Sequence, residues 1–427
     1  MIKIYDMETL EEREILFRGG SGADVSAPVA EILRAVQERG DAALREYTLR
    51  FDGAAPDALV VTAEEVDQAA AQVEPAFLAV LEEAAEHIRA YHARQKRESF
   101  VMTEREGVVL GQRIIPLARV GIYVPGGTAA YPSTVLMNAI PARIAGVGEI
   151  IMVTPPGRDG AVNPHILAAA KIAGVTRTYK VGGAQAVAAL AYGTGTIPQV
   201  DKIVGPGNAY VAEAKRQVFG RVNIDMIAGP SEVLVLADGA SNPAWVAADL
   251  LSQAEHDRMA AAVLVTDSRP LAEAVAHELE RQLAALPRAE IARASLEANG
   301  KLIVCRDLRE GIAVANRIAP EHLELCVDNP FDYLGEIQNA GSVFLGRYNP
   351  EPMGDYFAGP NHTLPTMGTA RFYSPLSVDD FVKKSQFSYY TRDALARDYR
   401  KVSLFARKEG LDAHARAVDI RFEGGEA

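Results

Sequence analysis

The stretch from Leu250 to Asp257 carries two side chains suited to metal binding. Gln253 and His256 stand three residues apart at the end of an apolar run that is typical of a helix, so both side chains lie on one helical face. Imidazole is the commonest nitrogen ligand of zinc, and an amide oxygen is an unusual but legitimate ligand of a divalent metal. The pair is also compatible with an ordinary structural role, so a metal site requires further ligands from elsewhere in the chain.

Carboxylates and imidazoles recur together in the last third of the chain. They stand at Glu321 and His322, at Asp355 and His362, and at Glu409 and His414. The adjacent Glu321 and His322, in a turn before a strand, form a pair typical of general acid–base catalysis, although a surface turn is the plainer alternative. The glycines and prolines of residues 354–366 forbid regular structure, and the apolar residues among them favour an ordered loop that carries functional groups.

A metal-ligand set of nitrogen and oxygen atoms can be drawn from these segments. Its members are Gln253, His256, Asp355 and His414. Such a set suits zinc or a similar divalent metal, with the substrate completing the coordination. Cys305 and Cys326 lie at or within predicted strands, outside any C-x-x-C motif, and are expected to be buried structural thiols.

Strands, glycine turns and helices alternate through the middle of the chain, which predicts parallel sheets with crossover helices. Three of the turns are candidates for a ligand site: Val124-Pro125-Gly126-Gly127, Val181-Gly182-Gly183-Ala184-Gln185 and Val204-Gly205-Pro206-Gly207-Asn208. At the carboxyl edge of a sheet such turns present backbone N–H groups to phosphate or another ligand. Tyr123, Gln185 and Asn208 lie in or beside them, but the G-x-G-x-x-G fingerprint of dinucleotide-binding folds is absent from the sequence.

We therefore expect an α/β fold with two tandem Rossmann-like lobes and parallel sheets, a short N-terminal arm and a small C-terminal helical domain. The expected parts are residues 1–22 (arm), 23–120 with 233–375 (first lobe, helices then sheet), 121–232 (second lobe) and 376–427 (helical segment, with helices at 378–384, 394–407 and 411–417). The last part has too few large apolar residues to bury a core alone, so we expect it to pack on another lobe or subunit.

The overall composition excludes several classes of protein. The 427 residues carry a net charge of −12, which argues against a nucleic-acid partner. The first six residues are polar and acidic rather than a signal peptide, and the sequence has no run of 18 apolar residues that could span a membrane. We expect a cytoplasmic protein with a hydrophobic content of 48%, as in ordinary globular chains.

Nearly end to end, the chain resembles the histidinol dehydrogenase family. The resemblance rests on six segments in order: Gly205-Pro206-Gly207-Asn208-Ala209-Tyr210, Ala228-Gly229-Pro230-Ser231-Glu232-Val233-Leu234-Val235, Ser252-Gln253-Ala254-Glu255-His256, Pro320-Glu321-His322-Leu323, Asn361-His362-Thr363-Leu364-Pro365-Thr366 and Glu409-Gly410-Leu411-Asp412-Ala413-His414. Each segment alone is only suggestive, and the six together are highly specific. The resemblance implies two successive NAD-dependent oxidations of L-histidinol to L-histidine, through an aldehyde-level species, in the last step of histidine biosynthesis.

The same resemblance implies a role for each candidate residue. It implies that each subunit binds one zinc ion through Gln253, His256, Asp355 and His414. It also implies that the lobe of residues 121–232 binds NAD, with contacts from Tyr123, Gln185 and Asn208. It assigns substrate contacts to Ser231, Gln253, His256, His322, Asp355, His362, Glu409 and His414. It makes His322 the base for the alcohol and Glu321 the base for the attacking water. It also implies a homodimer in which residues 376–427 cross to the partner, so that His414 and Glu409 complete the neighbouring site.

The absence of a candidate cysteine nucleophile agrees with this assignment. Oxidation of an aldehyde often proceeds through a thiol adduct, and without one water must attack with the help of a base such as Glu321. Three alternatives stay open at this point. They are a related dehydrogenase acting on another small polar alcohol, a zinc hydrolase in which Glu321 activates water, and a metal- or nucleotide-binding protein without catalysis.

Overall fold

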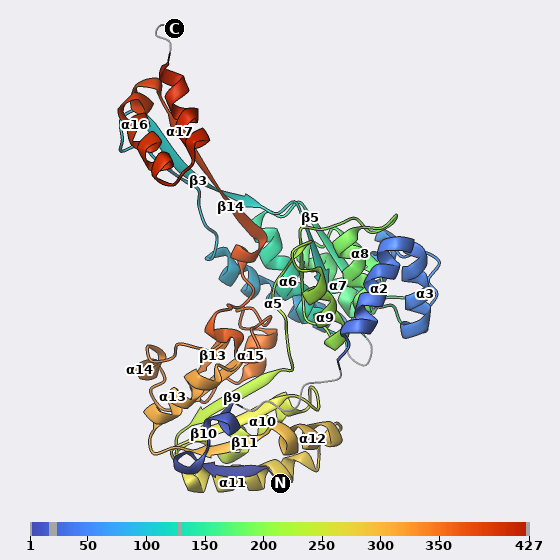
Figure 1. The fold of residues 1–427 in the computed structure, drawn as a ribbon. Coiled ribbons are helices and arrows are strands. Elements are labelled where there is room, and N and C mark those ends of the chain that lie inside the picture. The colour runs from blue at the N-terminus through green and yellow to red at the C-terminus, as the bar shows by residue number, and fades with distance from the viewer. Residues whose placement is uncertain (1, 17–23, 127–129, 424–427) are drawn as a thin grey trace. The chain divides into compact units, whose positions relative to one another are not determined.

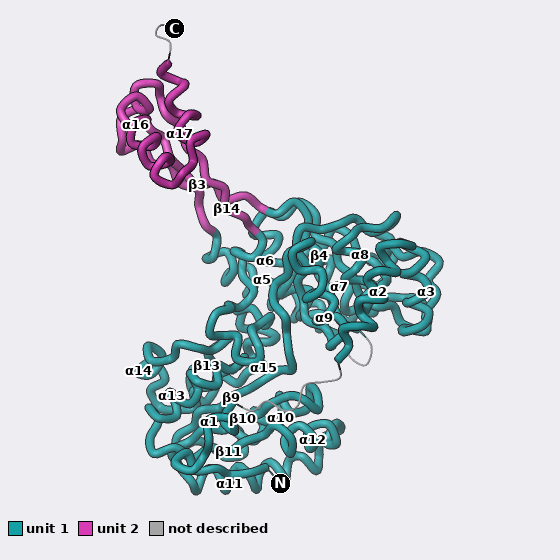
Figure 2. The backbone as a smooth tube through the Cα atoms, in the orientation of Figure 1, with its two compact units in different colours: residues 1–96, 117–381 teal, residues 97–116, 382–427 magenta. Residues whose placement is uncertain are grey.

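The computed structural model describes residues 2–16, 24–126 and 130–423. The chain divides into two compact units, which Figure 2 colours teal and magenta: residues 1–96 with 117–381, and residues 97–116 with 382–427. The first unit contains two parallel sheets, and the second contains an antiparallel sheet with two helices. The α/β class with parallel sheets is therefore confirmed.

The first parallel sheet has the strand order β6-β5-β4-β7-β8. Figure 1 labels β5 of this sheet and the helices that surround it. Its strands are β4 (Arg119–Tyr123), β5 (Glu149–Thr154), β6 (Arg177–Lys180), β7 (Lys202–Val204) and β8 (Asn223–Ile224). Helices follow the first four strands: α6 (Pro132–Ala145), α7 (Pro164–Ala173), α8 (Gly183–Tyr192) and α9 (Ala209–Val218). Ile150 to Val153 are buried on both faces of the sheet, which explains why a continuous apolar run forms an inner strand here.

The N-terminal helices pack on this first sheet's helices. They are α2 (Ser26–Arg39), α3 (Asp41–Asp52), α4 (Ala63–Gln72) and α5 (Pro75–Ala93). Helix α2 contacts α8 and α9, whereas α4 contacts α7 and α5 contacts α6. Val36 and Leu44 share one buried cluster with Leu190. The expected grouping of residues 23–120 with 233–375 is therefore corrected, because the apolar faces of these helices are buried in the lobe of residues 121–232.

The second parallel sheet has the order β1-β11-β10-β9-β12-β13. Its strands are β1 (Lys3–Asp6), β9 (Glu232–Ala237), β10 (Ala261–Thr266), β11 (Lys301–Val304), β12 (His322–Cys326) and β13 (Ser342–Leu345). Its helices are α10 (Pro243–Ala254), α11 (Arg269–Leu283), α12 (Ala289–Asn299) and α13 (Leu308–Ile318). Shorter elements complete the first unit: η1 (Met7–Thr9), α1 (Glu12–Ile15), α14 (Phe331–Leu334), α15 (Glu351–Tyr356), η2 (Thr369–Arg371) and η3 (Val378–Phe381).

The expected N-terminal arm contributes to this second sheet. Strand β1 pairs in parallel with β11, with Lys3 opposite Lys301 and Asp6 opposite Val304. Residue 1 and residues 17–22 of the expected arm lie outside the described residues. The arm is thus an edge strand, because a short alternating segment can add its backbone hydrogen bonds to an open sheet edge.

The second compact unit is built from β2 (Phe100–Met102), β3 (Val108–Pro116), β14 (Val382–Tyr390), α16 (Arg392–Lys408), α17 (Asp412–Asp419) and η4 (Ile420–Phe422). Strand β14 pairs antiparallel with β3 over its whole length. Of the helix expected at residues 378–384, the structure has the short 3-10 helix η3 and then β14, because the aromatic and β-branched residues that follow Phe381 favour a strand. The helices expected at residues 394–407 and 411–417 correspond to α16 and α17. Over the described ranges, no helix has both the length and the apolar composition to cross a membrane.

Candidate functional site

His322 begins strand β12 and lies at the amino edge of the six-stranded sheet. Its side chain is buried, and its Nδ1 lies 2.9 Å from the Glu232 carbonyl oxygen. Its Nε2 lies 3.7 Å from Asp355 Oδ1 and 3.9 Å from Glu351 Oε1. Donation from Nδ1 to the carbonyl leaves Nε2 of the neutral ring as the proton acceptor, facing these carboxylates.

The charges around His322 decide its affinity for a proton. Burial lowers the pKa of His322, but the carboxylates of Glu321, Asp355 and Glu351 together outweigh it and raise the pKa to about 10. A divalent cation on Asp355 would oppose this rise, because it cancels carboxylate charge. The side chain is thus held where its proton affinity depends strongly on the occupancy of the site.

Glu321 precedes His322 and is also buried. Its Oε2 accepts a hydrogen bond of 2.9 Å from the Glu232 N–H and lies 3.7 Å from His322 Nδ1. Burial raises the pKa of Glu321 to about 7. A carboxyl group that titrates near neutral pH is suited to proton transfer.

Asp355 stands in the last turn of α15, so the irregular structure expected for residues 354–366 begins only after this helix. The His362 Nδ1 lies 3.0 Å from the Asp355 carbonyl oxygen and 4.0 Å from its Oδ1. Burial raises the pKa of Asp355, but the neighbouring His322 and His362 outweigh it and hold that pKa below its usual range. Asp355 is therefore an ionised carboxylate between two imidazoles.

Gln253 provides the test of whether a metal fits here. Its side chain lies in α10, is 1% exposed, and has no hydrogen-bond partner at either amide atom within the described ranges. A buried amide without partners is costly, so a missing ligand is the natural explanation. His256 follows the end of α10; burial lowers its pKa, and the charge of Asp355 acts on it in the opposite direction. The expected residues of the first unit are thus compatible with a divalent metal.

Glu351 is a functional candidate that the sequence analysis missed. One ligand atom each of His322, Glu351 and Asp355 lies within 4.8 Å of the others. Burial and the charge of Asp355 raise the pKa of Glu351 to about 8. The spacing of Glu351 and Asp355, four residues apart, would have placed them on one face of a helix, but the prediction of irregular structure concealed this signal.

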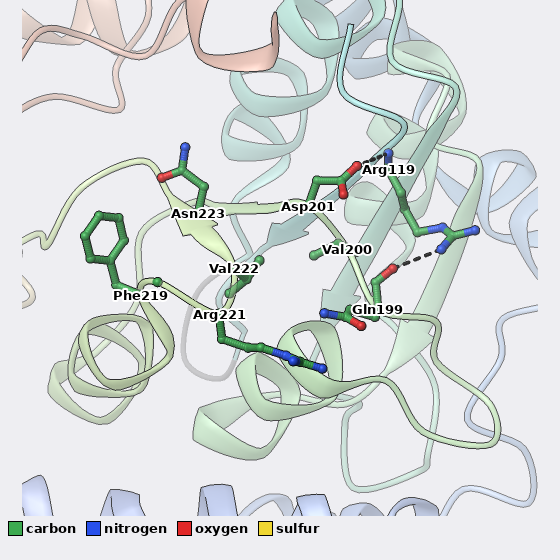
Figure 3. A pocket seen from close by; sticks show the side chains of 9 residues that line it. Arg119, Gln199, Val200, Asp201, Phe219, Arg221, Val222 and Asn223 are labelled. Atoms are coloured by element: carbon green, nitrogen blue, oxygen red, sulfur yellow. Dashed lines mark hydrogen bonds between the residues drawn. The ribbon is translucent and has the colours of Figure 1, made fainter. Parts of the chain in front are cut away.

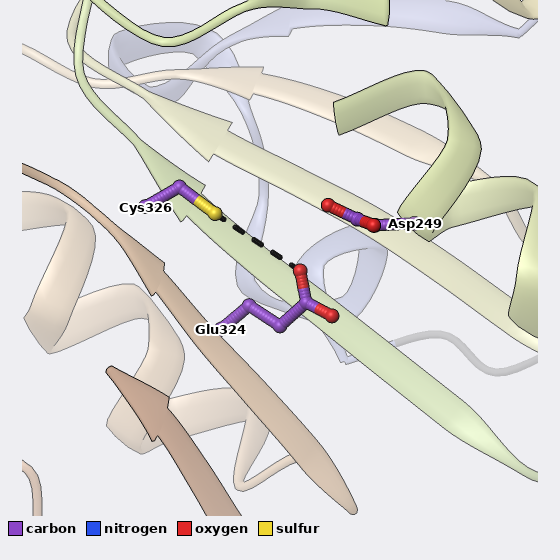
Figure 4. A group of neighbouring side chains, drawn as sticks. All are labelled: Asp249, Glu324 and Cys326. Atoms are coloured by element: carbon purple, nitrogen blue, oxygen red, sulfur yellow. Dashed lines mark hydrogen bonds between the residues drawn. The ribbon is translucent and has the colours of Figure 1, made fainter. Parts of the chain in front are cut away.

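A second cluster of acidic side chains, shown in Figure 4, is linked by a hydrogen bond to the cluster of His322, Glu351 and Asp355. It consists of Asp249, Glu324 and Cys326. Glu324 Oε1 accepts a hydrogen bond of 2.7 Å from the N–H of Glu351, the first residue of α15. Burial and the charge of Asp249 raise the pKa of Glu324 to about 9. The thiol of Cys326 is buried and burial raises its pKa, which agrees with the expected structural thiol.

The remaining predicted substrate residues are divided between the two compact units. In the first unit, His362 is mostly buried and its Nε2 lies 3.4 Å from Thr134 Oγ1, while Ser231 immediately precedes β9. In the second unit, Glu409 and His414 line one hollow on α16 and α17. The roles of Ser231, Glu409 and His414 stay predictions.

The carboxyl edge of the five-stranded sheet gathers the predicted coenzyme residues. Tyr123 ends β4, and its hydroxyl accepts a hydrogen bond of 3.1 Å from the Gly183 N–H. Gln185 lies in the first turn of α8, is 1% exposed, and among described residues has no hydrogen-bond partner for its amide. Asn208 caps α9 by accepting hydrogen bonds from the N–H groups of Tyr210 and Val211. The orphaned amide of Gln185 is compatible with a polar ligand at this edge.

The glycine turns meet at this edge, as expected. A Cβ atom on Gly126 or on Gly182 would lie within 3 Å of the Pro155 ring, and one on Gly205 would lie 2.2 Å from the Tyr123 carbonyl oxygen. Gly127 of the first turn lies outside the described residues. Glycine is thus needed where these turns closely approach Pro155 or the end of β4.

A hollow of about 560 Å³ lies at the opposite edge of the same sheet (Figure 3). It is lined by residues at the amino ends of β4, β7 and β8, including Arg119, Asp201 and Asn223. Arg119 is already paired with Glu149 at 2.8 Å, and Asp201 accepts hydrogen bonds from the N–H groups of residues 118 and 119. Because none of the candidate residues lines this hollow, its size does not make it the functional site.

Comparison with known proteins agrees with this arrangement. Residues 18–422 match the family model described as histidinol dehydrogenase. The chain is 55% identical over 416 residues to a histidinol dehydrogenase of Listeria monocytogenes serotype 4b (97% of each chain), and 57% identical over 424 residues to one of Geobacter metallireducens (98% of this chain, 97% of the other). The crystal structure of histidinol dehydrogenase from Elizabethkingia anophelis superimposes with a TM-score of 0.94 at 40% identity, covering 99% of this chain and 98% of that one. The chain therefore belongs to the histidinol dehydrogenase family of oxidoreductases.

Proposed function

We propose that this enzyme oxidises L-histidinol to L-histidine in two NAD-dependent steps, the last reaction of histidine biosynthesis. The observations that carry the proposal are the buried arrangement of Glu321, His322 and Asp355 and the unpartnered buried amide of Gln253. The substrate itself comes from the family to which the chain belongs.

His322 is proposed to remove the alcohol proton in the first oxidation. Its Nδ1 is held by the Glu232 carbonyl, so the ring keeps one orientation and its Nε2 can accept a proton. Removal of the hydroxyl proton allows the carbon to release a hydride and become an aldehyde. The buried setting excludes bulk water from the proton acceptor.

Glu321 is proposed to activate water in the second oxidation. Water adds to the aldehyde as the Glu321 carboxylate takes its proton, and the resulting hydrate releases the second hydride to give the acid. The raised pKa of Glu321, about 7, suits a base that must bind and release a proton near neutral pH. Cys305 and Cys326 are buried in the described fold, so a thiol pathway has no support.

The proposed cofactors are zinc or a similar divalent metal, and NAD. Zinc would be held by Gln253, His256, Asp355 and His414, and when bound it would hold the substrate's nitrogen atoms in place. NAD would lie against Tyr123, Gln185 and Asn208, and it supplies the hydride acceptor for both steps. The unpartnered amides of Gln253 and Gln185 support the two assignments independently.

The proposed assembly is a homodimer in which a second copy supplies Glu409 and His414. Both residues line an apolar hollow on α16 and α17, together with Phe405 and Leu411, which are 68% and 42% exposed. Exposed apolar side chains around two polar groups are typical of a surface that is covered in an assembly.

The proposal is tested by counting NADH formed per L-histidinol consumed by the purified enzyme with zinc. Two oxidations predict a ratio of two, whereas a simple alcohol dehydrogenase gives one. Absence of NADH from histidinol, with turnover of another polar alcohol, would replace the substrate. Metal binding without NAD binding by calorimetry would favour a hydrolase instead.

The shared site is tested by mixing subunits. A His414→Ala chain and a His322→Ala chain are each expected to be inactive, and their mixture is expected to recover part of the activity in hybrid dimers. Native mass spectrometry confirms that subunits have exchanged, and exchange without recovery would mean that each site is built from one chain.

A further inference from the structure

A buried ion pair lies directly behind the turn at Gly205. Lys215 Nζ, from α9, contacts Asp225 Oδ1, from the residue that follows β8, and the two side chains are only 3% and 1% exposed. Removing two charges from water is costly, and well-packed apolar residues often stabilise a fold as well as such a pair does. The pair therefore calls for an explanation beyond stability.

Both members of the pair hold the same residue. Asp225 Oδ2 accepts a hydrogen bond of 2.8 Å from the Gly205 N–H, and Lys215 Nζ donates one of 3.0 Å to the Gly205 carbonyl oxygen. Gly205 has a φ of +111°, and a Cβ there would collide with the Tyr123 carbonyl oxygen. The backbone of Gly205 is thus clamped on both sides, where the end of β7 is pressed against the end of β4.

The Lys215–Asp225 pair connects three parts of the carboxyl edge of the five-stranded sheet, where the predicted coenzyme residues lie. Lys215 belongs to α9, the helix that Asn208 caps. Asp225 also accepts a hydrogen bond of 2.7 Å through Oδ1 from the Met226 N–H, where the chain leaves β8 towards the second sheet. The pair therefore fixes the turn relative to both its helix and the connection that follows β8.

We propose that the buried Lys215–Asp225 pair positions the Gly205–Asn208 turn for the dinucleotide, as positioning residues that do not themselves contact it. The inference rests on the proposed use of NAD at this edge. A turn held in its bound conformation binds its ligand without a further ordering cost. The charges are retained because a lysine and a carboxylate together can satisfy a carbonyl and an N–H of one strained residue.

The test is a double variant, Lys215→Met with Asp225→Asn, which removes both charges and keeps one oxygen to accept from Gly205. We expect a folded enzyme whose KM for NAD rises about tenfold, the effect of one displaced hydrogen bond, while KM for histidinol stays within about twofold. The matched control is Lys202→Met with Asp380→Asn, which removes an ion pair of 2.8 Å at the other end of β7. The control is expected to leave KM for NAD unchanged.

A second measurement is independent of NAD. Amide hydrogen exchange in the coenzyme-free enzyme is expected to accelerate in residues 204–208 of the double variant and to stay unchanged at residues 181–185. Unchanged exchange at residues 204–208 in a folded variant overturns the positioning role. Faster exchange with an unchanged KM for NAD overturns the link to the coenzyme, and a wild-type enzyme that does not reduce NAD refutes the proposed function while leaving the exchange result valid.

Lys215→Met alone covers the case in which the double variant does not fold. It leaves Asp225 with its two backbone donors, and it removes the ion pair with Asp225 together with the hydrogen bond to the Gly205 carbonyl. We expect a smaller rise in KM for NAD and faster exchange at residues 204–208. A folded single variant with neither change overturns the proposal.

Discussion

The two parallel sheets of the first unit share one strand order once the edge strand β1 is set aside, but the residues predicted to be functional lie at opposite ends of the two sheets. In the sheet β6-β5-β4-β7-β8, the predicted coenzyme residues lie at the carboxyl ends of the strands: Tyr123 ends β4, Asn208 follows β7, and Gln185 follows β6. In the sheet of β9 to β13, Glu321 and His322 stand at the amino end of β12. Open α/β sheets generally bind ligands at the carboxyl ends, so the second sheet departs from that rule.

The carboxyl edge of the second sheet explains the departure. Arg347, beyond the end of β13, is ion-paired with Asp238 at 2.5 Å and also with Asp328, and these two carboxylates follow β9 and β12. This edge of the second sheet therefore carries ion-paired side chains where the first sheet has glycine turns. The five-stranded sheet has glycine turns and neutral amides at its carboxyl edge. The six-stranded sheet has the ionisable groups of Glu321 and His322 at its amino edge.

Among the predicted changes, removal of the His322 imidazole should have the largest effect on activity. His322→Asn is expected to lower kcat about 10²- to 10⁴-fold, because the proposed proton acceptor is lost. NAD affinity and zinc content should stay the same, since His322 is not among the predicted metal or NAD ligands. Steady-state kinetics, calorimetry and metal analysis measure these quantities, and exposed His277→Asn on α11 is the control. A variant with unchanged turnover would remove His322 from the chemistry.

At the carboxyl edge of the five-stranded sheet, coenzyme binding should depend on the backbone conformation of Gly205. Gly205→Ala forces a side chain into positive φ and against the Tyr123 carbonyl, and backbone strain alone costs about 1–3 kcal/mol. We expect a lower free energy of unfolding in urea and a higher KM for NAD. Gly220→Ala is the matched control, because Gly220 has a φ of +97° but a Cβ added there would meet no atom within 4 Å. Equal losses in the two variants would show that close approach to Tyr123 is unimportant.

The ion pairs at the carboxyl edge of the second sheet should matter for stability and not for the coenzyme. Arg347→Met leaves the mostly buried Asp238 without its cation, which is expected to lower the free energy of unfolding by about 1–3 kcal/mol. KM for NAD should stay within error of the wild type. Urea unfolding and steady-state kinetics test both statements, and a clear rise in KM for NAD would mean that this edge takes part in coenzyme binding.

These contrasts also show what the sequence could predict. Strand–turn–helix alternation located the three glycine turns, which follow β4, β6 and β7 of the first sheet. Local patterns cannot say which sheet a set of helices will cover, so the docking of α2 to α5 on the first sheet was missed. The same limit applies to β1, whose partner β11 lies some 300 residues away in the chain.

The site was predicted unevenly for a related reason. The motif residues Glu321, His322 and Gln253 carry their chemistry in their types and spacing. Glu351 was missed because α15, which places it on one helical face with Asp355, was not predicted. Glu324 was missed because only the folded chain brings it beside Asp249. Repulsion between neighbouring buried carboxylates can be recognised only once their burial is known.

The smallest expected effect concerns a half-buried carboxyl in the coenzyme lobe, Asp52 at the end of α3. Its Oδ2 has no hydrogen-bond partner among the residues that the structure describes, and burial raises the pKa of Asp52 to about 6 from 3.8. The folded state therefore favours the protonated form. The stability that Asp52 contributes through this raised pKa is fully present when the pH is below the unfolded pKa near 3.8. It is lost as the pH rises through about 6.

Asp52→Asn keeps the shape of the side chain and removes this dependence. The thermal midpoint of the variant should equal that of the wild type at pH 4 and exceed it slightly at pH 8, since only the wild type must then hold a partly buried charge. Differential scanning calorimetry across this range measures the difference, with exposed Asp57→Asn as the control for loss of one negative charge. A variant less stable than wild type at pH 8 would mean that the Asp52 carboxylate is paired in solution. In that case the coenzyme lobe, like the acid–base centre, would depend on an ionised side chain, and the contrast between the two sheets would be weaker than the structure indicates.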